Sequence, residues 1–355
     1  MSTVHVVVPE AVDDPRRPSG GTTYDRRVAA GLSSCGWTVH RHVATGDWPS
    51  ADRPSRSALT TTLAGLPDDA VVLLDGLVAS VVPEVLVPEG RRLRLVVLVH
   101  LPLGVGATGG HAAEQLSGEC AVLAASVAVV ATSRWTRQWL LGTYGLQHGR
   151  VHVVVPGVDE APVVPGSISG ERLVCVGAVT HVKGPDVLVD ALAEVADVGW
   201  SCTCIGSMAV DPAYAEHVRS RAAALHLHDR LLFSGPLVGP DLDAAYAAAD
   251  LVVAPSRAET YGMAVTEALA RGIPTVGSDV GGLPEALGRA PDGCRPGILV
   301  PAGDAARLAD ALRCWLTDAG LRADLRRAAR ARRATLTDWS VTADRLAGIL
   351  REVAA

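Results

Sequence analysis

Two glutamates flank a glycine in the segment PSRAETYGMAVTEALARGIPTVGSDVGGLPE, which covers residues 255–285. Glu259 precedes Gly262, and Glu267 follows that glycine inside a run with helical periodicity. A helix that starts after a strand leaves its first backbone N–H groups without partners inside the helix, and such groups bind phosphate well. Gly262 has no Cβ, so a ligand can approach its backbone closely. The segment therefore predicts an anion-binding helix start between two carboxylates, with Thr260 as its N-cap.

The separation of the two glutamates decides which chemistry they suit. Five helical residues advance the chain by ~7.5 Å, at ~1.5 Å per residue. A retaining glycosidase needs its two carboxyl groups ~5–5.5 Å apart, so Glu259 and Glu267 do not suit that role. We expect them to hold different parts of one long ligand, since a carboxylate accepts hydrogen bonds from the vicinal hydroxyls of a ribose or a hexose. Solvated or capping glutamates are the alternative.

Short β-branched runs alternate with longer Ala- and Leu-rich helical patterns along the whole chain, which is typical of βαβ units around parallel sheets. A loose segment rich in proline and glycine, residues 158–171, interrupts this rhythm and reads as a linker. The sequence thus predicts two successive Rossmann-type α/β domains with a cleft between them. The predicted strands are 4–9, 38–43, 70–76, 93–100, 127–133 and 151–157 before the linker, and 172–179, 200–206, 230–235, 251–256, 274–279 and 297–303 after it.

Composition limits the function classes. The 355 residues are 48% hydrophobic and carry a net charge of -6, which argues against a nucleic-acid binder because such a protein shows a basic footprint. The longest apolar run without charge, 120–131, is too short to span a bilayer. No signal peptide is recognised and the seven cysteines are scattered, so we expect reduced thiols and a cytoplasmic location. The arginine-rich run 322–333 leaves peripheral membrane contact open.

The segment 255–285 resembles the retaining family-4 glycosyltransferases of GT-B fold. Their signature is two glutamates separated by seven residues, followed by a small-Gly-hydrophobic-Pro strand and a Gly-Gly-hydrophobic-Pro-Glu turn. The matching residues here are Glu259, Tyr261, Gly262, Glu267, Gly272, Ile273, Pro274, Gly281, Gly282, Leu283, Pro284 and Glu285. The resemblance implies that Glu259 contacts the donor sugar and Glu267 the nucleotide ribose. It also implies that the backbone at Tyr261, Gly262 and Met263 meets the diphosphate.

Other parts of the second half extend the resemblance. Lys183 in VGAVTHVKGPDV matches the family's lysine, whose implied role is to neutralise the donor diphosphate. Many members also carry an arginine where this chain has Ala178, and the sequence does not show what replaces it. His181 is either a partial substitute or a solvated loop histidine. Backbone from Gly235 to Leu237 would bracket the nucleotide base without selecting one.

The first half carries weaker motifs. Gly20 and Gly21 resemble the family's glycine-rich loop after the first strand, which lets the backbone approach the transferred sugar and phosphate. His100 ends a predicted strand and resembles the histidine that contacts the donor sugar near the reacting centre; strand C-terminal ends face the ligand crevice in open α/β sheets. Asp75 ends the preceding predicted strand and either binds the acceptor or caps the next turn. Asp25 lies early in a helix, where a negative charge favours the dipole.

Taken over nearly the whole chain, the resemblance implies a GT-B fold with two Rossmann-like domains facing a cleft. Residues 1–160 would form the acceptor-side domain, residues 161–337 the nucleotide-sugar domain, and residues 338–355 a helix crossing back to the first domain. The implied reaction is retaining transfer of a hexose-type sugar from a UDP- or GDP-sugar to a hydroxyl of an unknown acceptor.

Within that reaction, Lys183, Glu259 and His100 are the expected catalytic residues. Neither a cofactor nor a metal is expected, since no DxD-type motif stands near a phosphate loop. A GT-B nucleotide-sugar epimerase and a non-catalytic nucleotide-sugar-binding protein are the alternatives. A Rossmann dehydrogenase is disfavoured because no GxGxxG follows a predicted strand.

Overall fold

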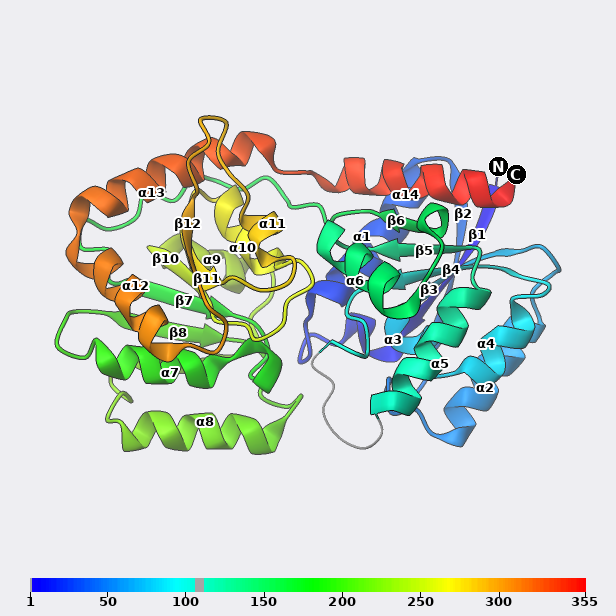
Figure 1. The fold of residues 1–355 in the computed structure, drawn as a ribbon, viewed down its shortest axis with the longest axis horizontal. Helices are drawn as coiled ribbons and strands as arrows, with labels where there is room; N and C mark the ends of the chain where they lie inside the picture. Colours follow the sequence, from blue (N-terminus) through cyan, green and yellow to red (C-terminus); the bar gives the residue numbers. More distant parts are fainter. Residues whose placement is uncertain (1, 106–111) are drawn as a thin grey trace. The chain divides into compact units, whose positions relative to one another are not determined.

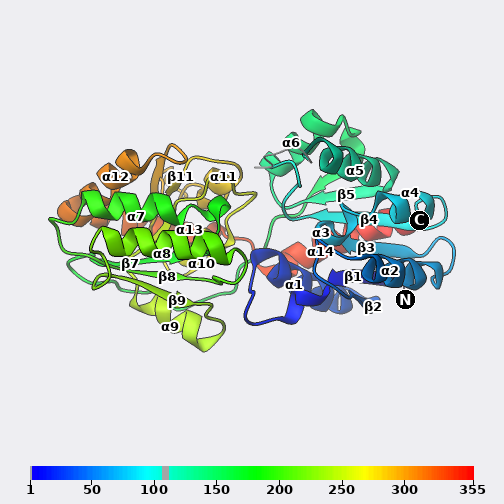
Figure 2. The same ribbon diagram turned by 90° about the horizontal axis from the view of Figure 1, so that it is seen from below.

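The computed structural model describes residues 2–105 and 112–355 and divides the chain into two compact units (Figure 1). The first unit takes in Met1–Asp14, Gly21–Gly157 and Thr337–Ala355, and the second Pro15–Gly20 and Val158–Leu336. Each unit is built on one six-stranded parallel sheet with helices on its faces (Figure 2). All twelve predicted strands are present, with boundaries shifted by a few residues.

The first unit has the strand order β2-β1-β3-β4-β5-β6. Its strands are almost continuously apolar because parallel strands are covered on both faces. Helices α1 and α14 pack on one face through Tyr24, Leu32 and Leu346, while α2, α4, α5 and α6 pack on the other. The strands are β1 Ser2–Pro9, β2 Trp37–Ala44, β3 Val71–Asp75, β4 Arg94–Val99, β5 Ala128–Ala131 and β6 Val151–Val153. The helices are α1 Gly20–Ser34, α2 Arg53–Ala64, α3 Gly76–Ala79, α4 Pro83–Glu89, α5 Ala112–Ala125, α6 Arg134–Tyr144 and α14 Trp339–Ala354.

The second unit has the strand order β12-β11-β10-β7-β8-β9. Its main core joins the sheet to α7, α8 and α12, with Trp315 fully buried at its centre. The strands are β7 Arg172–Val176, β8 Ser201–Ile205, β9 Leu231–Gly235, β10 Leu251–Ala254, β11 Thr275–Ser278 and β12 Gly297–Val300. The helices are α7 Pro185–Glu194, α8 Pro212–Ala224, α9 Pro240–Ala248, α10 Met263–Ala270, α11 Leu283–Leu287, α12 Ala305–Thr317 and α13 Ala319–Arg332.

The C-terminal helix α14 belongs to the first unit, as the sequence predicts. Its apolar stripe, Leu346, Ala347 and Leu350, is fully buried in the core that α1 shares. At its start, the Thr342 hydroxyl donates to the Val155 carbonyl at 3.0 Å. The stripe and this hydrogen bond fix α14 against the sheet of the first unit.

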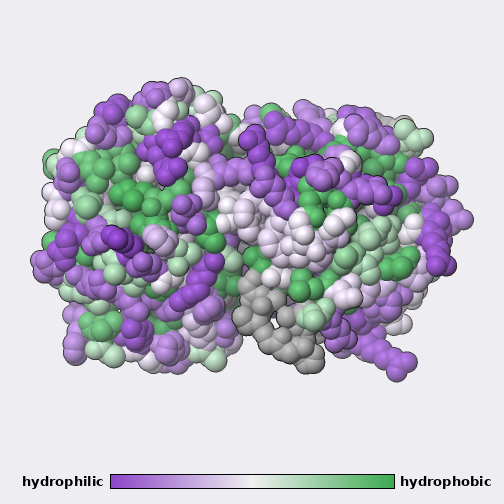
Figure 3. Space-filling view, viewed as in Figure 1, coloured by the Kyte–Doolittle hydropathy of each residue, from purple (hydrophilic) through white to green (hydrophobic). Residues whose placement is uncertain are grey.

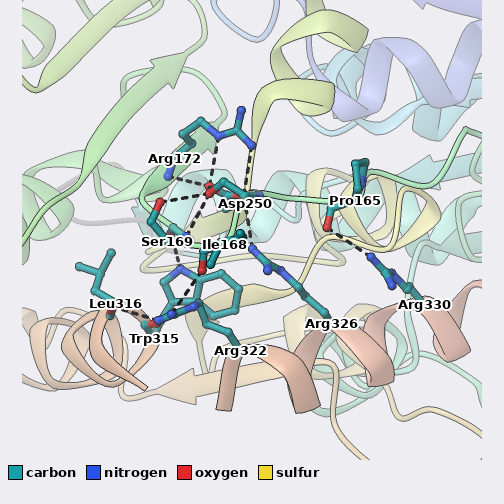
Figure 4. Close-up of polar contacts among 12 residues, drawn as sticks. Pro165, Ile168, Ser169, Arg172, Asp250, Trp315, Leu316, Arg322, Arg326 and Arg330 are labelled. Atoms are coloured by element: carbon teal, nitrogen blue, oxygen red, sulfur yellow. Dashed lines mark hydrogen bonds and ion pairs between the residues drawn. The ribbon is translucent and has the colours of Figure 1, made fainter. Parts of the chain in front are cut away.

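The segment 158–171 contains no helix or strand, and a buried carboxylate holds its end in place (Figure 4). Asp250, just before β10, accepts hydrogen bonds from the Ser167 backbone and hydroxyl, from the Arg172 backbone and guanidinium, and from Arg326 on α13. Trp315 Nε1–H donates to the Gly170 carbonyl at 2.7 Å. The segment is therefore an integral part of the second unit.

Two local predictions are wrong. Gly20 and Gly21 do not form a loop but begin helix α1. The N-cap of α10 is Gly262 and not Thr260, because the chain enters the helix through a left-handed conformation (φ +106°) that glycine adopts readily.

The surface and the helix lengths bear on membrane contact. Apolar side chains on the face drawn in Figure 3 are interspersed with hydrophilic ones on both units. Within the described residues, no helix is both long and apolar enough to cross a bilayer. The cytoplasmic location and the peripheral membrane contact remain predictions.

Candidate active site

An ion pair joins two motifs of the second unit that lie 76 positions apart. Lys183, in the turn after β7, donates from Nζ to Glu259 Oε2 at 2.6 Å. Gly184 makes this possible: it has φ +65°, and a Cβ there would lie 2.3 Å from the Pro255 carbonyl oxygen. Lys183 is also the one lysine among the 32 lysine and arginine residues of the chain. This singular use of lysine is a sequence signal that supports a special role for position 183.

The Gly-Gly pair of the third motif packs against the same segment. Gly282 N–H donates to the Glu259 carbonyl at 2.8 Å. A Cβ at Gly281 would lie 1.8 Å from that carbonyl oxygen, and one at Gly282 would lie 2.0 Å from the Thr260 carbonyl oxygen. Both positions therefore require glycine, and the pair fixes the backbone that carries Glu259.

Helix α10 starts directly after this backbone. Its first N–H groups have no acceptor inside the helix, and Gly262, its N-cap, adds no side chain at the start. Tyr261, the residue before the N-cap, is 8% exposed. Burial raises the pKa of the Tyr261 hydroxyl to about 12, with Arg332 opposing and Glu285 reinforcing the rise, so the side chain stays neutral. The residue that precedes the helix start is therefore buried and uncharged.

Glu267 has a separate partner, as expected for a carboxylate with a separate task. Its Oε2 accepts from the buried Tyr246 hydroxyl at 2.8 Å, and the Arg271 guanidinium lies over the Tyr246 ring at 4.6 Å. Burial raises the pKa of Glu267, although the Tyr246 hydrogen bond and the charge of Arg271 oppose the rise. Leu237 packs in the same apolar cluster as Tyr246, and Gly235 ends β9 with φ +78°.

The neighbouring Arg257 does not replace the arginine that the family pattern has at position 178. Arg257 donates from both terminal nitrogens to Asp186, at 2.7 and 2.6 Å, and also to the His181 carbonyl at 3.1 Å. Burial favours the neutral acid at Asp186, but hydrogen bonds from Arg257 and Tyr214 outweigh it and lower the pKa to about 2. Arg257 thus serves the local fold, and Ala178 leaves the site with one positive charge fewer than the family pattern.

In the first unit, His100 follows β4 and lies against the start of α1. Its Nε2 is 2.9 Å from Asp25 Oδ1, and the Tyr24 ring meets the imidazole edge-on at 5.3 Å. A Cβ at Gly21 would lie 3.1 Å from His100 Cδ2, so the small residue gives the imidazole room. The structure thereby brings together two predicted site residues, Gly21 and His100. Gly20 groups with the second unit, where a Cβ would lie 3.0 Å from Met263 Sδ.

Asp75 completes this cluster. One of its oxygens caps α3 by accepting from Leu77 N–H at 2.8 Å, which is the capping alternative that the sequence left open. One donor atom each of Asp25, Asp75 and His100 also lie within 4.8 Å of one another. The sequence predicted a helix-dipole role for Asp25 and did not reveal this grouping. The available signal was that Asp75 and His100 end two consecutive predicted strands.

One cavity of the second unit lies away from these residues. A volume of about 620 Å³ opens where β7 and β8 begin, beside Arg172, Trp200 and Arg230. Arg172 is bound to Asp250, and Arg230 lies over the Trp200 ring at 3.8 Å and donates to its carbonyl. Because these cations are engaged in the fold, the cavity offers little to an anion.

Comparison with known proteins identifies the family. Residues 168–332 match the family model described as glycosyl transferases group 1. A D-inositol 3-phosphate glycosyltransferase 1 of Catenulispora acidiphila is 31% identical over 351 residues, covering 89% of this chain and 81% of the relative. A D-inositol 3-phosphate glycosyltransferase of Acidothermus cellulolyticus is 35% identical, covering 67% of this chain and 56% of its own length.

Solved structures show the same fold over the full chain. HepE of Anabaena, in complex with UDP-glucose, has a TM-score of 0.79 at 18% identity and covers 99% of this chain and 100% of its own. Sucrose-phosphate synthase of Thermosynechococcus elongatus has a TM-score of 0.77 at 21% identity, with 99% of each chain covered. The fold and the site thus define a glycosyltransferase of GT-B fold. The chain belongs to the family-4 glycosyltransferases.

Proposed function

We propose that this glycosyltransferase moves a hexose-type sugar from a UDP- or GDP-sugar to a hydroxyl of a phosphorylated polyol, with retention at the anomeric carbon. The Lys183–Glu259 ion pair beside the start of α10 carries the proposal. The choice of acceptor class rests on the relatives named D-inositol 3-phosphate glycosyltransferase. The choice of donor nucleotide class draws support from HepE, which was solved with UDP-glucose.

Lys183 and Glu259 neutralise each other in their ion pair. A donor offers each of them a better partner: the diphosphate takes the ammonium group, and the sugar hydroxyls take the carboxylate. The exchange costs little because both groups are partly exposed, at 36% and 13% of their side chains. Once on the diphosphate, the Lys183 charge stabilises the negative charge that grows on the leaving nucleotide.

The rest of the donor follows the order of the chain. The first N–H groups of α10 meet the diphosphate, where the helix dipole adds to the charge of Lys183. Glu267, oriented by the Tyr246 hydroxyl, accepts from the ribose hydroxyls. The backbone from Gly235 to Leu237 lies beside the base. His100 donates to the donor sugar near the anomeric carbon.

Retention follows if the acceptor attacks from the face that the nucleotide leaves. The bond from the anomeric carbon to the diphosphate oxygen breaks as the bond to the acceptor oxygen forms, through an oxocarbenium-like state. The acceptor proton passes to an oxygen of the leaving diphosphate, so no protein nucleophile is needed. Lys183 and the helix amides provide the countercharge in this scheme, which therefore works without a metal.

A panel of UDP- and GDP-hexoses, including UDP-glucose, tests the proposal with and without D-inositol 3-phosphate. We expect nucleoside diphosphate release that depends on the acceptor, and a glycoside whose anomeric proton coupling in NMR matches the donor's α configuration. EDTA should leave the rate unchanged. An inverted product would contradict the mechanism, and strict dependence on a divalent cation would contradict metal independence.

The same panel separates the rival functions. An epimerase converts the donor to an isomeric sugar nucleotide without any acceptor. A non-catalytic binding protein shows saturable nucleotide-sugar binding with no release of nucleotide. Either result would replace the transferase proposal.

A further inference from the structure

Three ionisable side chains of the first unit converge from neighbouring strands. Asp75 ends β3, His100 follows β4, and Asp25 lies in α1, which follows β1; the order β1-β3-β4 in the sheet makes these elements adjacent. The side chain of Asp25 is 3% exposed and that of His100 17% exposed, while Asp75 is 5% exposed overall. Buried charges are costly unless they are paired. A buried cluster of two acids and one base therefore needs a defined distribution of protons.

The hydrogen bonds show where one proton resides. Asp25 Oδ1 and His100 Nε2 are 2.9 Å apart, so the Nε2 proton is donated to the carboxylate. The other oxygen, Asp25 Oδ2, is buried and has no hydrogen-bond partner within the described residues. Asp75 is the neighbouring carboxyl group, and one of its oxygens already accepts from Leu77 N–H. Two ionised carboxylates side by side would repel each other here, so one of them must carry a proton.

We propose that Asp25 is a positioning residue that keeps His100 an imidazolium, with Nε2–H committed to Asp25 and Nδ1–H available to the oxygens of the donor, while Asp75 carries the carboxyl proton that keeps the cluster neutral. The identity of the ligand rests on the proposed function; the proton distribution does not. An imidazolium has no free lone pair and cannot accept the acceptor's proton. His100 therefore binds and polarises the donor but is not the base, which agrees with proton transfer to the leaving diphosphate.

The groups that face His100 support this assignment. From α1 come Asp25 and Tyr24, and from the β3–α3 junction comes Asp75. Burial disfavours the charged imidazole, but the charge and hydrogen bond of Asp25 outweigh it and raise the pKa of His100 to about 9. Burial, followed by the charge of Asp25, raises the pKa of Asp75 well above its ordinary value. Burial raises the pKa of Tyr24 also, so it stays neutral.

The decisive measurement is an NMR titration of the His100 ring in the intact chain, assigned by comparison with the His100→Gln variant. We expect its midpoint near pH 9 in the wild type. In Asp25→Asn it should fall to 7 or below, a loss of at least ~100-fold in proton affinity. The control is Asp69→Asn. Asp69 is an exposed aspartate that precedes the first residue of β3, at the end opposite Asp75, and its substitution should leave the His100 midpoint unchanged. A wild-type midpoint near 6.5, or no change in Asp25→Asn, would overturn the proposal.

A second variant guards against misfolding. Asp75→Asn keeps an acceptor for Leu77 N–H but cannot carry a carboxyl proton, and the His100 midpoint should stay above 7 because Asp25 remains. If Asp25→Asn fails to fold, the wild-type midpoint alone decides the question. A shift of the His100 signals when Mg²⁺, Mn²⁺ or Zn²⁺ is added at pH 7 would show a cation site in place of the proposed distribution of protons and would also overturn the proposal.

Activity then separates this inference from the proposed function. With a competent donor and acceptor, the wild-type kcat should fall as pH rises through 9, and that of Asp25→Asn should fall about two pH units earlier. If His100 Nδ1–H polarises the donor, Asp25→Asn should lower kcat by a larger factor than it changes the KM for the donor. If the NMR result holds but no nucleotide sugar is turned over, the transferase proposal fails and the proton assignment stands. If turnover occurs but His100 is neutral at pH 7, the proton assignment fails and the transferase proposal stands.

Discussion

Asp250 and Asp25 are both buried aspartates, 1% and 3% exposed, yet their surroundings differ in kind. Asp250 accepts from two backbone N–H groups, the Ser167 hydroxyl and two guanidinium groups, all within the second unit. Asp25 accepts from His100 and has one buried oxygen without a partner in the described residues, beside a second carboxyl group. A buried charge whose hydrogen bonds are complete serves the fold, whereas an incompletely satisfied one is poised for a ligand or a proton.

The proton affinities of the two regions point in opposite directions. At Asp250, burial favours the neutral acid, but hydrogen bonds from Arg172 and Ser167 outweigh it and lower the pKa. In the Asp25 cluster, the pKa values of both Asp75 and His100 are raised, which favours the protonated form of each group. Because the pKa shifts have opposite directions, experiments can perturb the Asp250 region and the Asp25 cluster separately.

The largest effect should come from Asp250→Ala. The variant leaves Arg326, Arg172 and the Ser167 N–H group without their acceptor, and breaking a buried ion pair from one side costs about 3–5 kcal/mol. Urea denaturation should show this loss in the transition that belongs to the second unit. The kcat of the molecules that remain folded should stay within a factor of two of the wild type. A stable Asp250→Ala protein with low kcat would place Asp250 in the active site and erase the contrast.

Lys183→Ala should have the next largest effect, and it should lower kcat. Removing a cation that stabilises growing charge lowers kcat by about 10²–10³. Stability should change by less than ~1 kcal/mol, because the Lys183–Glu259 pair is partly exposed. Lys183→Arg is the matched control, which keeps the charge and should recover part of the rate.

Binding of the nucleotide can be followed directly at Lys183. Because Lys183 is the one lysine of the chain, reductive ¹³C-methylation labels its amine, together with the N-terminus, for NMR. Nucleotide should shift the Lys183 signal as Glu259 is replaced by the diphosphate. An unchanged signal at saturating nucleotide would remove Lys183 from the donor site.

Stability against pH should separate the two regions with opposite signs. The folded pKa of His100, about 9, lies above the unfolded value of 6.5, so its stabilising contribution is complete below pH 6.5 and is lost as pH rises through 9. Asp75, with a raised pKa, acts in the same direction. Asp250 has a lowered pKa, so its contribution is present above pH ~4 and is lost as pH falls through the lower folded value.

Calorimetry from pH 3 to pH 10 measures both slopes. The wild type should lose on the order of 2 kcal/mol between pH 6.5 and 9 from the His100 contribution. Asp25→Asn should flatten this alkaline slope, and Asp250→Asn should flatten the acid slope. If Asp25→Asn changes only the acid side, the cluster does not hold its protons as described.

The contrast also explains what the sequence could reveal. The spacing of Glu259 and Glu267 could be recognised in the sequence because both lie within one local segment. The strands were predictable because a doubly covered parallel strand such as β3 is a continuous apolar run. The Asp25–His100 contact was not, since it joins residues 75 positions apart and depends on strand order and on the phase of α1. The family resemblance predicted a loop at Gly20 and Gly21, but helix α1, which packs on the sheet, includes both.

The smallest effect should come from Tyr246→Phe. This variant tests Glu267, whose hydrogen bonding is intermediate between that of Asp250 and that of Asp25. Glu267 has one hydroxyl donor, from Tyr246, and a nearby cation, Arg271, so it is neither fully satisfied nor left with a buried unpartnered oxygen. Removing the hydroxyl should raise the KM for the nucleotide sugar by about 3–10-fold, because water can replace part of the bond at the half-buried carboxylate. The kcat should change little, and Glu267→Gln should raise KM further. A fall in kcat at constant KM would mean that Glu267 acts in the chemical step. The degree to which a carboxylate is satisfied would then no longer separate binding groups from reacting ones.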